Sequence, residues 1–311
     1  MKKIELYLDE TKGHQMSFRI SVPIWGSSIN CNAYKNEIKT IVDSSTILGN
    51  DFKGFHAYNL SDSNWHTIGK VYISVINKFK EYVLDNKLNF MIRIEAKEVY
   101  EKNGGYLKAI AKKGLQERDS ELGKIFTSLK DKDIPALYHR IDQLIIYLKY
   151  RDKFGGEDAE FDFYPDSEGK ILKYENKQFT VQGNHFVDYP LDFYDIIKIW
   201  GNSLTKVILE LIPNCNWPNI NQKLNKFEPK KSTDDFIIQT CDIISNFFFC
   251  YINDVIGINN DKNKLKGKAI NDLIPLSEFQ NLIQDSFKKG LEDEVICTNQ
   301  DLKALIEVVN Q

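Results

Sequence analysis

The sequence lacks the features of secreted, disulfide-bonded and zinc-binding proteins. Its 311 residues contain five cysteines, an odd number, and no two of them form a C-x-x-C pair. They are Cys31, Cys215, Cys241, Cys250 and Cys297. Cysteines that are so few and so widely spaced predict neither a disulfide framework nor a zinc site. The amino-terminal segment contains no apolar stretch of the kind found in signal peptides, so we expect a cytoplasmic protein.

Long apolar runs are also missing. The most apolar window, residues 236–252, is interrupted by Gln239, Asp242, Ser245 and Asn246. Polar residues at these intervals favour a buried helix over a membrane span. We therefore expect no membrane partner.

The sequence has no large excess of charge of either sign and lacks several common enzyme motifs. The formal net charge is -3, and the contents of 42% hydrophobic and 27% charged residues are typical of a globular protein. This net charge argues against a generally basic surface that coats nucleic acid, although a local basic patch stays open. No G-x-x-x-x-G-K-S/T or G-x-G-x-x-G loop, G-x-S-x-G elbow or H-E-x-x-H helix occurs.

Hydrophobic periodicity predicts an α/β fold whose mixed sheet opens with an antiparallel hairpin. Apolar and polar residues alternate over 4–8 and 16–24, with a short polar stretch between the two segments. Further strands are predicted at 90–94, 160–166 and 223–228, and helices at 33–48, 65–86, 106–130, 134–153, 191–211 and 234–253. Strands first, and then strands in alternation with helices, indicate helices packed on a mixed sheet.

The composition changes after residue 255. Residues 257–272 are polar and rich in lysine, which predicts a linker, and two short helices are predicted at 275–290 and 299–309. We therefore divide the chain into a sheet domain, residues 1–255, and a linker with a C-terminal helical appendage, residues 256–311. The basic run of the linker is usually a solvated loop and less often a phosphate contact; it consists of Lys262, Lys264, Lys266 and Lys268.

Acidic residues end two of the predicted strands. Asp9, with Glu10 directly after it, follows the first strand, and Asp166 ends the fourth. Ligands bind at such strand ends in α/β sheets, and neighbouring strands would bring both carboxylates to one metal ion. Acidic residues are also ordinary components of turns, and that interpretation stays open. Asp162, on the same strand face as Asp166, is the alternative ligand.

Asp242 is the strongest single indication of a site. It is the only charged residue between Phe236 and Ile252, in a segment that is apolar nearly all round. A buried carboxylate is costly unless a cation or hydrogen bonds compensate it. Asp235, Gln239, Asp242 and Asn246 recur at helical spacing and form one polar stripe, for which a solvated surface is the alternative interpretation.

His56 is a further candidate, in a predicted loop between two helices. A histidine in such a loop is able to bind metal, bind phosphate or shuttle a proton. A structural histidine is the commoner case.

Three short segments carry a resemblance to a known family. Residues 7–11, Tyr-Leu-Asp-Glu-Thr, resemble a first-strand Asp-Glu-Ser, with Thr11 in place of Ser. Residues 52–57, Phe-Lys-Gly-Phe-His-Ala, resemble a Glu-hydrophobic-His-Ala segment, with Gly54 where an acidic residue is common. Ser232 and residues 237–244 resemble a late Ser followed by a Gln-x-Ala-Asp helix, with Cys241 for Ala. Together they resemble the prokaryotic family called domain of unknown function 3800 (DUF3800), of the ribonuclease-H-like superfamily.

The resemblance implies a ribonuclease-H-like sheet on which three metal ligands converge: Asp9, Asp166 and Asp242. Asp166 fits the middle position better than Asp162. Glu10 and His56 are then expected beside the ligands as catalytic residues, and Gln239 as a cofactor-binding residue. The implied chemistry is phosphodiester hydrolysis with Mg²⁺ or Mn²⁺, which carboxylates suit, with two ions about 4 Å apart.

The leading hypothesis is therefore a divalent-metal-dependent nuclease of the phage-defence or mobile-element kind, with DNA or RNA as its partner. The alternative is a non-catalytic ribonuclease-H-like interaction module that acts with a partner protein, which Gly54 and the acidic net charge favour. A phosphohydrolase that acts on a small nucleotide is a third hypothesis. A homo-oligomer is left open.

Overall fold

The computed structural model describes part of the chain. The described residues are 2–11, 18–48, 52, 54–56, 60–61, 64–96, 143, 146–147, 150, 153–155, 159–166, 224–228, 230–257, 264–273, 284 and 295–298. The helices predicted at 106–130, 191–211 and 299–309 lie outside these residues. Of the helices predicted at 134–153 and 275–290, the described positions 143, 146–147, 150, 153–154 and 284 are helical.

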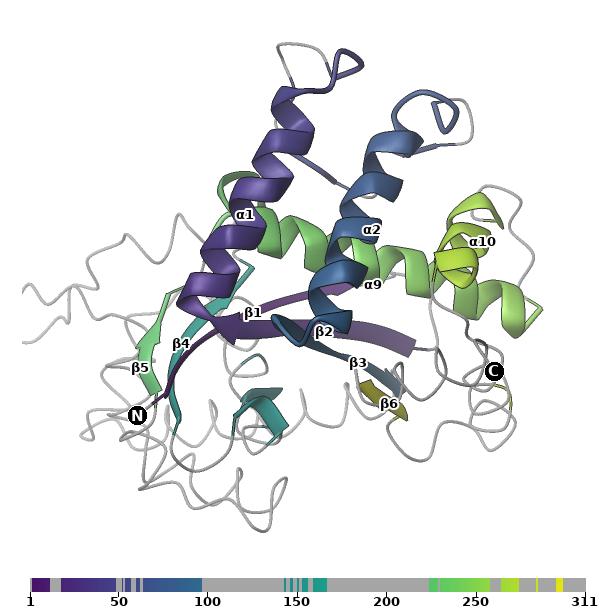
Figure 1. The fold of residues 1–311 in the computed structure, drawn as a ribbon. Helices are drawn as coiled ribbons and strands as arrows, with labels where there is room; N and C mark the ends of the chain where they lie inside the picture. The colour runs from purple at the N-terminus through teal and green to yellow at the C-terminus, as the bar shows by residue number, and fades with distance from the viewer. Residues whose placement is uncertain are drawn as a thin grey trace, which may run out of the picture. The chain divides into compact units, whose positions relative to one another are not determined.

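The centre of the fold is a mixed sheet with ribonuclease-H-like topology (Figure 1). Its strands are β1 (Lys2–Thr11), β2 (Phe18–Ser27), β3 (Leu88–Ala96), β4 (Ala159–Pro165), β5 (Leu224–Phe227) and β6 (Val295–Thr298). They lie in the order β5-β4-β1-β2-β3-β6. β1–β2, β2–β3 and β3–β6 pair antiparallel, and a parallel bridge joins Asp166 to Lys230 beside β4. The predicted opening hairpin, β1–β2, is confirmed.

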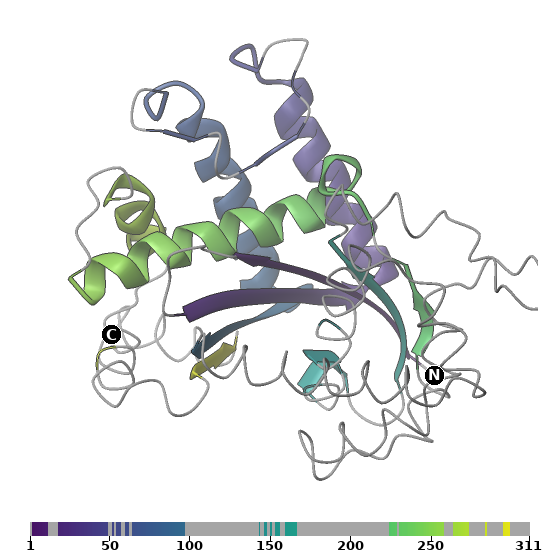
Figure 2. The ribbon, with the colours of Figure 1, turned by 180° about the vertical axis from the view of Figure 1, so that it is seen from behind.

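Three helices cover one face of β1, β2 and β3 (Figures 1 and 2). They are α1 (Ser28–Asp43), α2 (Gly69–Leu84) and α9 (Phe236–Val255). α9 runs across β1 and β2 and packs against α1 and α2. α1 begins at Ser28 rather than at residue 33, because the Ser27 side chain caps the helix by accepting a hydrogen bond from Asn30 N.

α9 is the core helix of this layer. It is the only helix within the described segments that is long and apolar enough to cross a membrane, and 83% of its most apolar window is buried inside the protein. Its buried residues include Ile238, Cys241, Ile244 and Phe248. The prediction of a buried helix is confirmed.

The segment after α9 differs from the prediction. α10 (Lys264–Leu273) occupies part of the predicted linker and packs on α9 and α2. The approach to α9 is close, since a Cβ atom added to Gly267 would lie 3.1 Å from the backbone of Tyr251. The linker interpretation is therefore wrong from Lys264 onward. β6 was not anticipated either; it extends the sheet at the β3 edge.

The chain divides into two compact units. The first holds residues 2–98, 163–166 and 229–311, with β1 to β3, β6, α1, α2, α9 and α10. The second holds residues 99–162 and 167–228. In the second unit, Tyr147 packs edge-on against Phe161, and Asn225 donates a hydrogen bond to the Asp162 carboxylate.

Candidate metal centre

The ends of β1 and β4 place two carboxylates together. β1 and β4 are neighbours in the sheet, as the shared-metal hypothesis requires. Asp166, directly after β4, donates from its backbone N to the carbonyl oxygen of Leu8 at 2.8 Å. Asp9 is the next residue along β1. The two acids therefore lie side by side on neighbouring strands.

α9 brings a third carboxylate to the same face. Asp9 and Thr11 share one face of β1 because side chains alternate along a strand, and Thr11 Oγ1 donates to Ser245 Oγ of α9 at 2.7 Å. Cys241 also lies beside Asp9: burial, followed by the charge of Asp9, raises the pKa of its thiol. Asp242 follows directly and its side chain is 24% exposed, so the helix sets it at the edge of the buried layer.

The three carboxylates interact electrostatically. Burial, and then the charges of Asp166 and Asp242, raise the pKa of Asp9 well above its ordinary value. A hydrogen bond of 2.7 Å from Glu10 N to Asp9 Oδ1 acts in the opposite direction. Desolvation and like charges both disfavour the ionised form. Asp9 is thus a buried acid that the folded protein favours in its protonated form.

His56 lies next to Asp242. The distance from His56 Nδ1 to Asp242 Oδ2 is 3.9 Å, and both side chains are partly exposed. The backbone of this loop is held by hydrogen bonds, since Tyr72 of α2 donates from its hydroxyl to the His56 carbonyl oxygen at 2.9 Å. The structure therefore brings His56 to the acidic cluster, where a proton carrier or phosphate-binding group would be useful.

Gln239 has a different place from the one predicted. Its Oε1 accepts a hydrogen bond from Phe55 N at 2.9 Å, and its Nε2 donates to the Ser232 carbonyl oxygen at 2.7 Å. The side chain is buried. Because both ends of the amide bind backbone groups, Gln239 acts between two segments of the protein, and the assignment as a cofactor-binding residue does not fit.

The Glu10 side chain does not join the cluster. Successive side chains of a strand point to opposite faces, so the carboxylate of Glu10 lies on the other side of β1 from that of Asp9. There it pairs with Arg19 at 3.1 Å, and Arg19 pairs in turn with Glu95. All three are buried. A direct catalytic role for the Glu10 side chain is therefore corrected to a structural ion pair.

Asp166 lies beside Asp9, whereas the Asp162 carboxylate has a different partner. Asp162 accepts a hydrogen bond of 2.8 Å from Asn225 Nδ2, in the second compact unit. It precedes Asp166 by four residues, or about 13 Å along an extended strand. Asp166 is the acid whose charge acts on Asp9.

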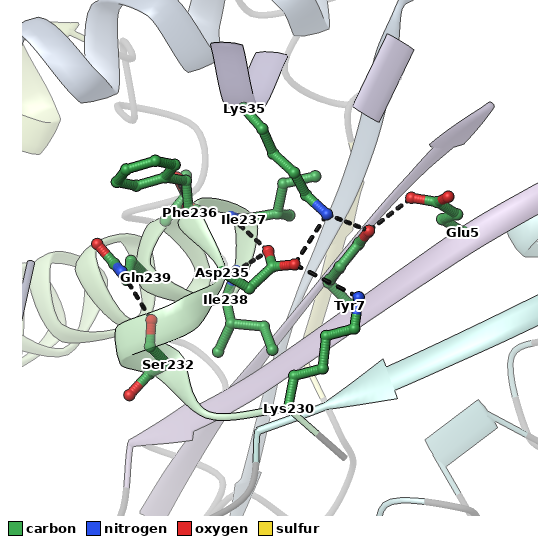
Figure 3. A network of polar contacts seen from close by, with 11 residues as sticks. Glu5, Tyr7, Lys35, Lys230, Ser232, Asp235, Phe236, Ile237, Ile238 and Gln239 are labelled. Atoms are coloured by element: carbon green, nitrogen blue, oxygen red, sulfur yellow. Dashed lines mark hydrogen bonds and ion pairs between the residues drawn. The ribbon is translucent and has the colours of Figure 1, made fainter. Parts of the chain in front are cut away.

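A cluster of lysine, tyrosine and acidic residues anchors the start of α9 beside the site (Figure 3). Asp235 caps the helix by accepting from Ile237 N at 2.9 Å. The same carboxylate pairs with Lys35 at 2.8 Å and Lys230 at 3.7 Å. Lys35 also donates to the hydroxyl of Tyr7, which lies two residues before Asp9 on the same strand face. These contacts connect the first half of α9, which carries Asp242, with the end of β1 that carries Asp9.

The sequence indicated Asp235 only as part of the polar stripe, and this cluster was not predicted. An acid directly before an apolar helix is a recognisable N-cap, so Asp235 carried a signal. Lys35 and Lys230 carried none, because isolated lysines are ordinary surface residues. Lys266, assigned to a solvated run, is in fact buried in α10 and donates to Asn246 Oδ1 at 3.1 Å. Lys268 is exposed, and Lys262 lies outside the described residues.

The donor set of the site suits a hard divalent cation. Carboxylates are the ligands that Mg²⁺ and Mn²⁺ prefer. Among the described residues, however, no group of three or more His, Cys, Asp or Glu side chains lies close enough together to hold a metal ion. Cys31, Cys241 and Cys250 are free and buried. The charges of these side chains act on one another, and a site for Mg²⁺ or Mn²⁺ stays a prediction.

Comparisons of the chain with protein-family models, with curated proteins and with solved structures find no match. What the structure establishes is the class: an α/β fold with a mixed sheet of ribonuclease-H-like topology and helices on it.

Proposed function

We propose that this protein is a divalent-metal-dependent nuclease and a divergent member of the DUF3800 family. The observation that supports the proposal is the position of Asp166 beside Asp9, where Asp166 N bonds to the Leu8 carbonyl oxygen, together with the charges of Asp166 and Asp242 that act on Asp9. Three carboxylates from two strand ends and a helix are costly to keep together without a counter-charge. A divalent cation would remove this cost, and catalysis is a common use of such a site.

The three aspartates would hold Mg²⁺ or Mn²⁺, after a rotation of side chains that brings their oxygens to ligand distance. When bound, the metal supplies an activated water and stabilises the leaving oxygen of a phosphodiester. His56, 3.9 Å from Asp242, is positioned to accept or return a proton at the edge of the cluster. Because an acidic cluster repels phosphate, nucleic-acid binding should depend on metal.

A cleavage assay tests the proposal. Purified protein is incubated with single-stranded and structured DNA and RNA in Mn²⁺ or Mg²⁺, with and without chelator. We expect cleavage that chelator abolishes and that Asp9→Asn and Asp242→Asn remove. Asp254→Asn is the matched control, because Asp254 is exposed on the same helix as Asp242 and should leave cleavage unchanged. Cleavage that survives Asp9→Asn would contradict the assignment.

His56→Ala tests whether His56 carries a proton or binds the metal. We expect the cleavage rate to fall by roughly 10²-fold or more, since that is the typical contribution of general acid–base catalysis. Metal affinity should remain close to that of the unchanged protein. Loss of metal binding in this variant would instead make His56 a ligand.

The second candidate function is a non-catalytic interaction module. The observation that favours it is the absence, over the described ranges, of three side chains closed around a metal position. On this alternative no substrate is cleaved, and the protein co-purifies with a stoichiometric partner protein. The substrate panel has to be repeated with that partner present, because a partner is able to complete an active site.

A further inference from the structure

The segment Gly54–His56, called here the His56 loop, is held by α9 through Gln239. Phe55 N donates to Gln239 Oε1 at 2.9 Å, in a buried position. The opposite end of the same amide donates to the Ser232 carbonyl oxygen at 2.7 Å. Gln239 is 1% exposed. Its side chain therefore has a single orientation that satisfies both bonds, and the loop backbone is fixed to that orientation.

Gly54 makes this contact possible. Its φ is +113°, a conformation that residues with side chains rarely adopt. A Cβ atom added at Gly54 would lie 2.8 Å from Gln239 Nε2. Because hydrogen bonds hold both ends of this amide, it cannot swing away without losing them. Glycine is therefore required at position 54 for the loop to contact Gln239 in this way.

A second contact holds the loop from the side of α2. The Tyr72 hydroxyl donates to the His56 carbonyl oxygen at 2.9 Å. The Phe55 ring is packed edge-on between those of Phe52, at 4.9 Å, and Tyr72, at 5.1 Å. His56 is therefore held by the hydrogen bond to its own carbonyl oxygen and by the contacts of the Phe55 backbone N and ring.

We propose that Gln239 and Tyr72 are positioning residues that hold the imidazole of His56 beside the Asp242 carboxylate. Gln239 and Asp242 are three residues apart on α9, so one rigid element carries both the acid and the holder of the histidine loop. This arrangement keeps His56 Nδ1 at 3.9 Å from Asp242 Oδ2. The inference deepens the proposed function and depends on it only for its consequence in catalysis.

Nuclear magnetic resonance of the His56 ring tests the positioning without any assay of activity. The full chain is labelled at histidine ring carbons, and His56→Ala assigns the signal. In the otherwise unchanged protein, Asp242→Asn should shift the His56 signal because the charge beside the ring is lost. In Gln239→Met and in Tyr72→Phe, the same Asp242→Asn change should shift it by less than half as much.

Tyr34→Phe is the matched control for Tyr72→Phe. The Tyr34 hydroxyl also forms a hydrogen bond to α9, with Thr240 Oγ1 at 2.9 Å, and this bond does not involve the His56 loop. The full Asp242-dependent shift should persist in this control. Tyr72→Phe keeps its ring packing, so it also serves if Gln239→Met does not fold. An undiminished shift in both Gln239→Met and Tyr72→Phe overturns the proposal.

If the protein cleaves nucleic acid, kinetics give a second readout. Gln239→Met and Tyr72→Phe should lower kcat with unchanged metal affinity, and should add no further loss when His56 is already alanine. An additive loss on the His56→Ala background would mean that they act on the fold rather than through His56. A failure of cleavage would count against the nuclease and leave the resonance result to decide the positioning.

Discussion

Asp9 is the residue on which the electrostatics of the site centre. Burial, Asp166 and Asp242 raise its pKa, so the folded protein holds the Asp9 proton more tightly than the unfolded chain does. The stabilisation from this proton is fully present below the unfolded pKa of about 3.9 and is lost as pH rises through the folded pKa. At neutral pH, metal-free protein is therefore less stable than it would be with a neutral side chain at position 9.

Asp9→Asn should raise the free energy of unfolding at neutral pH in chelator and flatten its decline with rising pH. The reason is that the amide does not ionise and does not repel its neighbours. Urea unfolding over a pH series measures both effects, with Asp254→Asn as a control that keeps the decline. A variant whose stability falls with pH as steeply as that of the unchanged protein would show that Asp9 is not the responsible group.

Asp242→Asn tests the ligand set at a partly exposed position. We expect the fold to persist and the Mg²⁺ or Mn²⁺ affinity to fall, because the amide keeps the shape but loses the charge that the cation requires. Titration calorimetry measures the change against Asp254→Asn on the same helix. Equal affinities in the two variants would remove Asp242 from the site.

At the scale of elements, the start of α9 is the junction on which the site depends. Asp235 caps the helix and forms ion pairs with Lys35 and Lys230 (Figure 3). Asp235→Ala should destabilise the protein by about 2 kcal/mol or more, because a lost cap alone costs up to about that amount and two lysines lose their counter-ion. Chemical unfolding measures the loss.

Asp234→Ala is the matched control, since this neighbouring acid is exposed. It should change stability little. A similar effect from both substitutions would mean that the network contributes through general charge and not through the cap. Metal affinity of Asp235→Ala should also fall, because the end of α9 that leads to Asp242 is less firmly held.

For the molecule as a whole, metal binding should be linked to folding. A cation that binds only the folded state stabilises it by about 2.7 kcal/mol at a concentration one hundred times its Kd. Mg²⁺ or Mn²⁺ should therefore raise the Tm, and sodium chloride of equal ionic strength should not. The increase should vanish in Asp9→Asn and Asp242→Asn. An equal increase in these variants would indicate binding elsewhere on the protein.

Some elements could be predicted well and others not, for a physical reason. β1, β2 and β3 alternate in hydrophobicity, and α9 is nearly continuous in apolar residues, so each is recognisable alone. α10 and β6 were not, because their stability comes from neighbours: α10 rests on α9 at Gly267, and β6 on the edge of β3. A polar, lysine-rich segment carries no sign of such support.

The same distinction holds for the candidate site. The sequence by itself determined that Asp9 and Asp166 lie at or near the ends of strands and that Asp242 interrupts an apolar helix, since these are properties of local pattern. Only the tertiary structure decided that β4 lies beside β1, that the carboxylates act on one another, and that Glu10 faces away to Arg19. It also decided that Gln239 holds the His56 loop. These outcomes depend on contacts between residues far apart in the chain, and local periodicity contains no information about which distant partner each side chain meets.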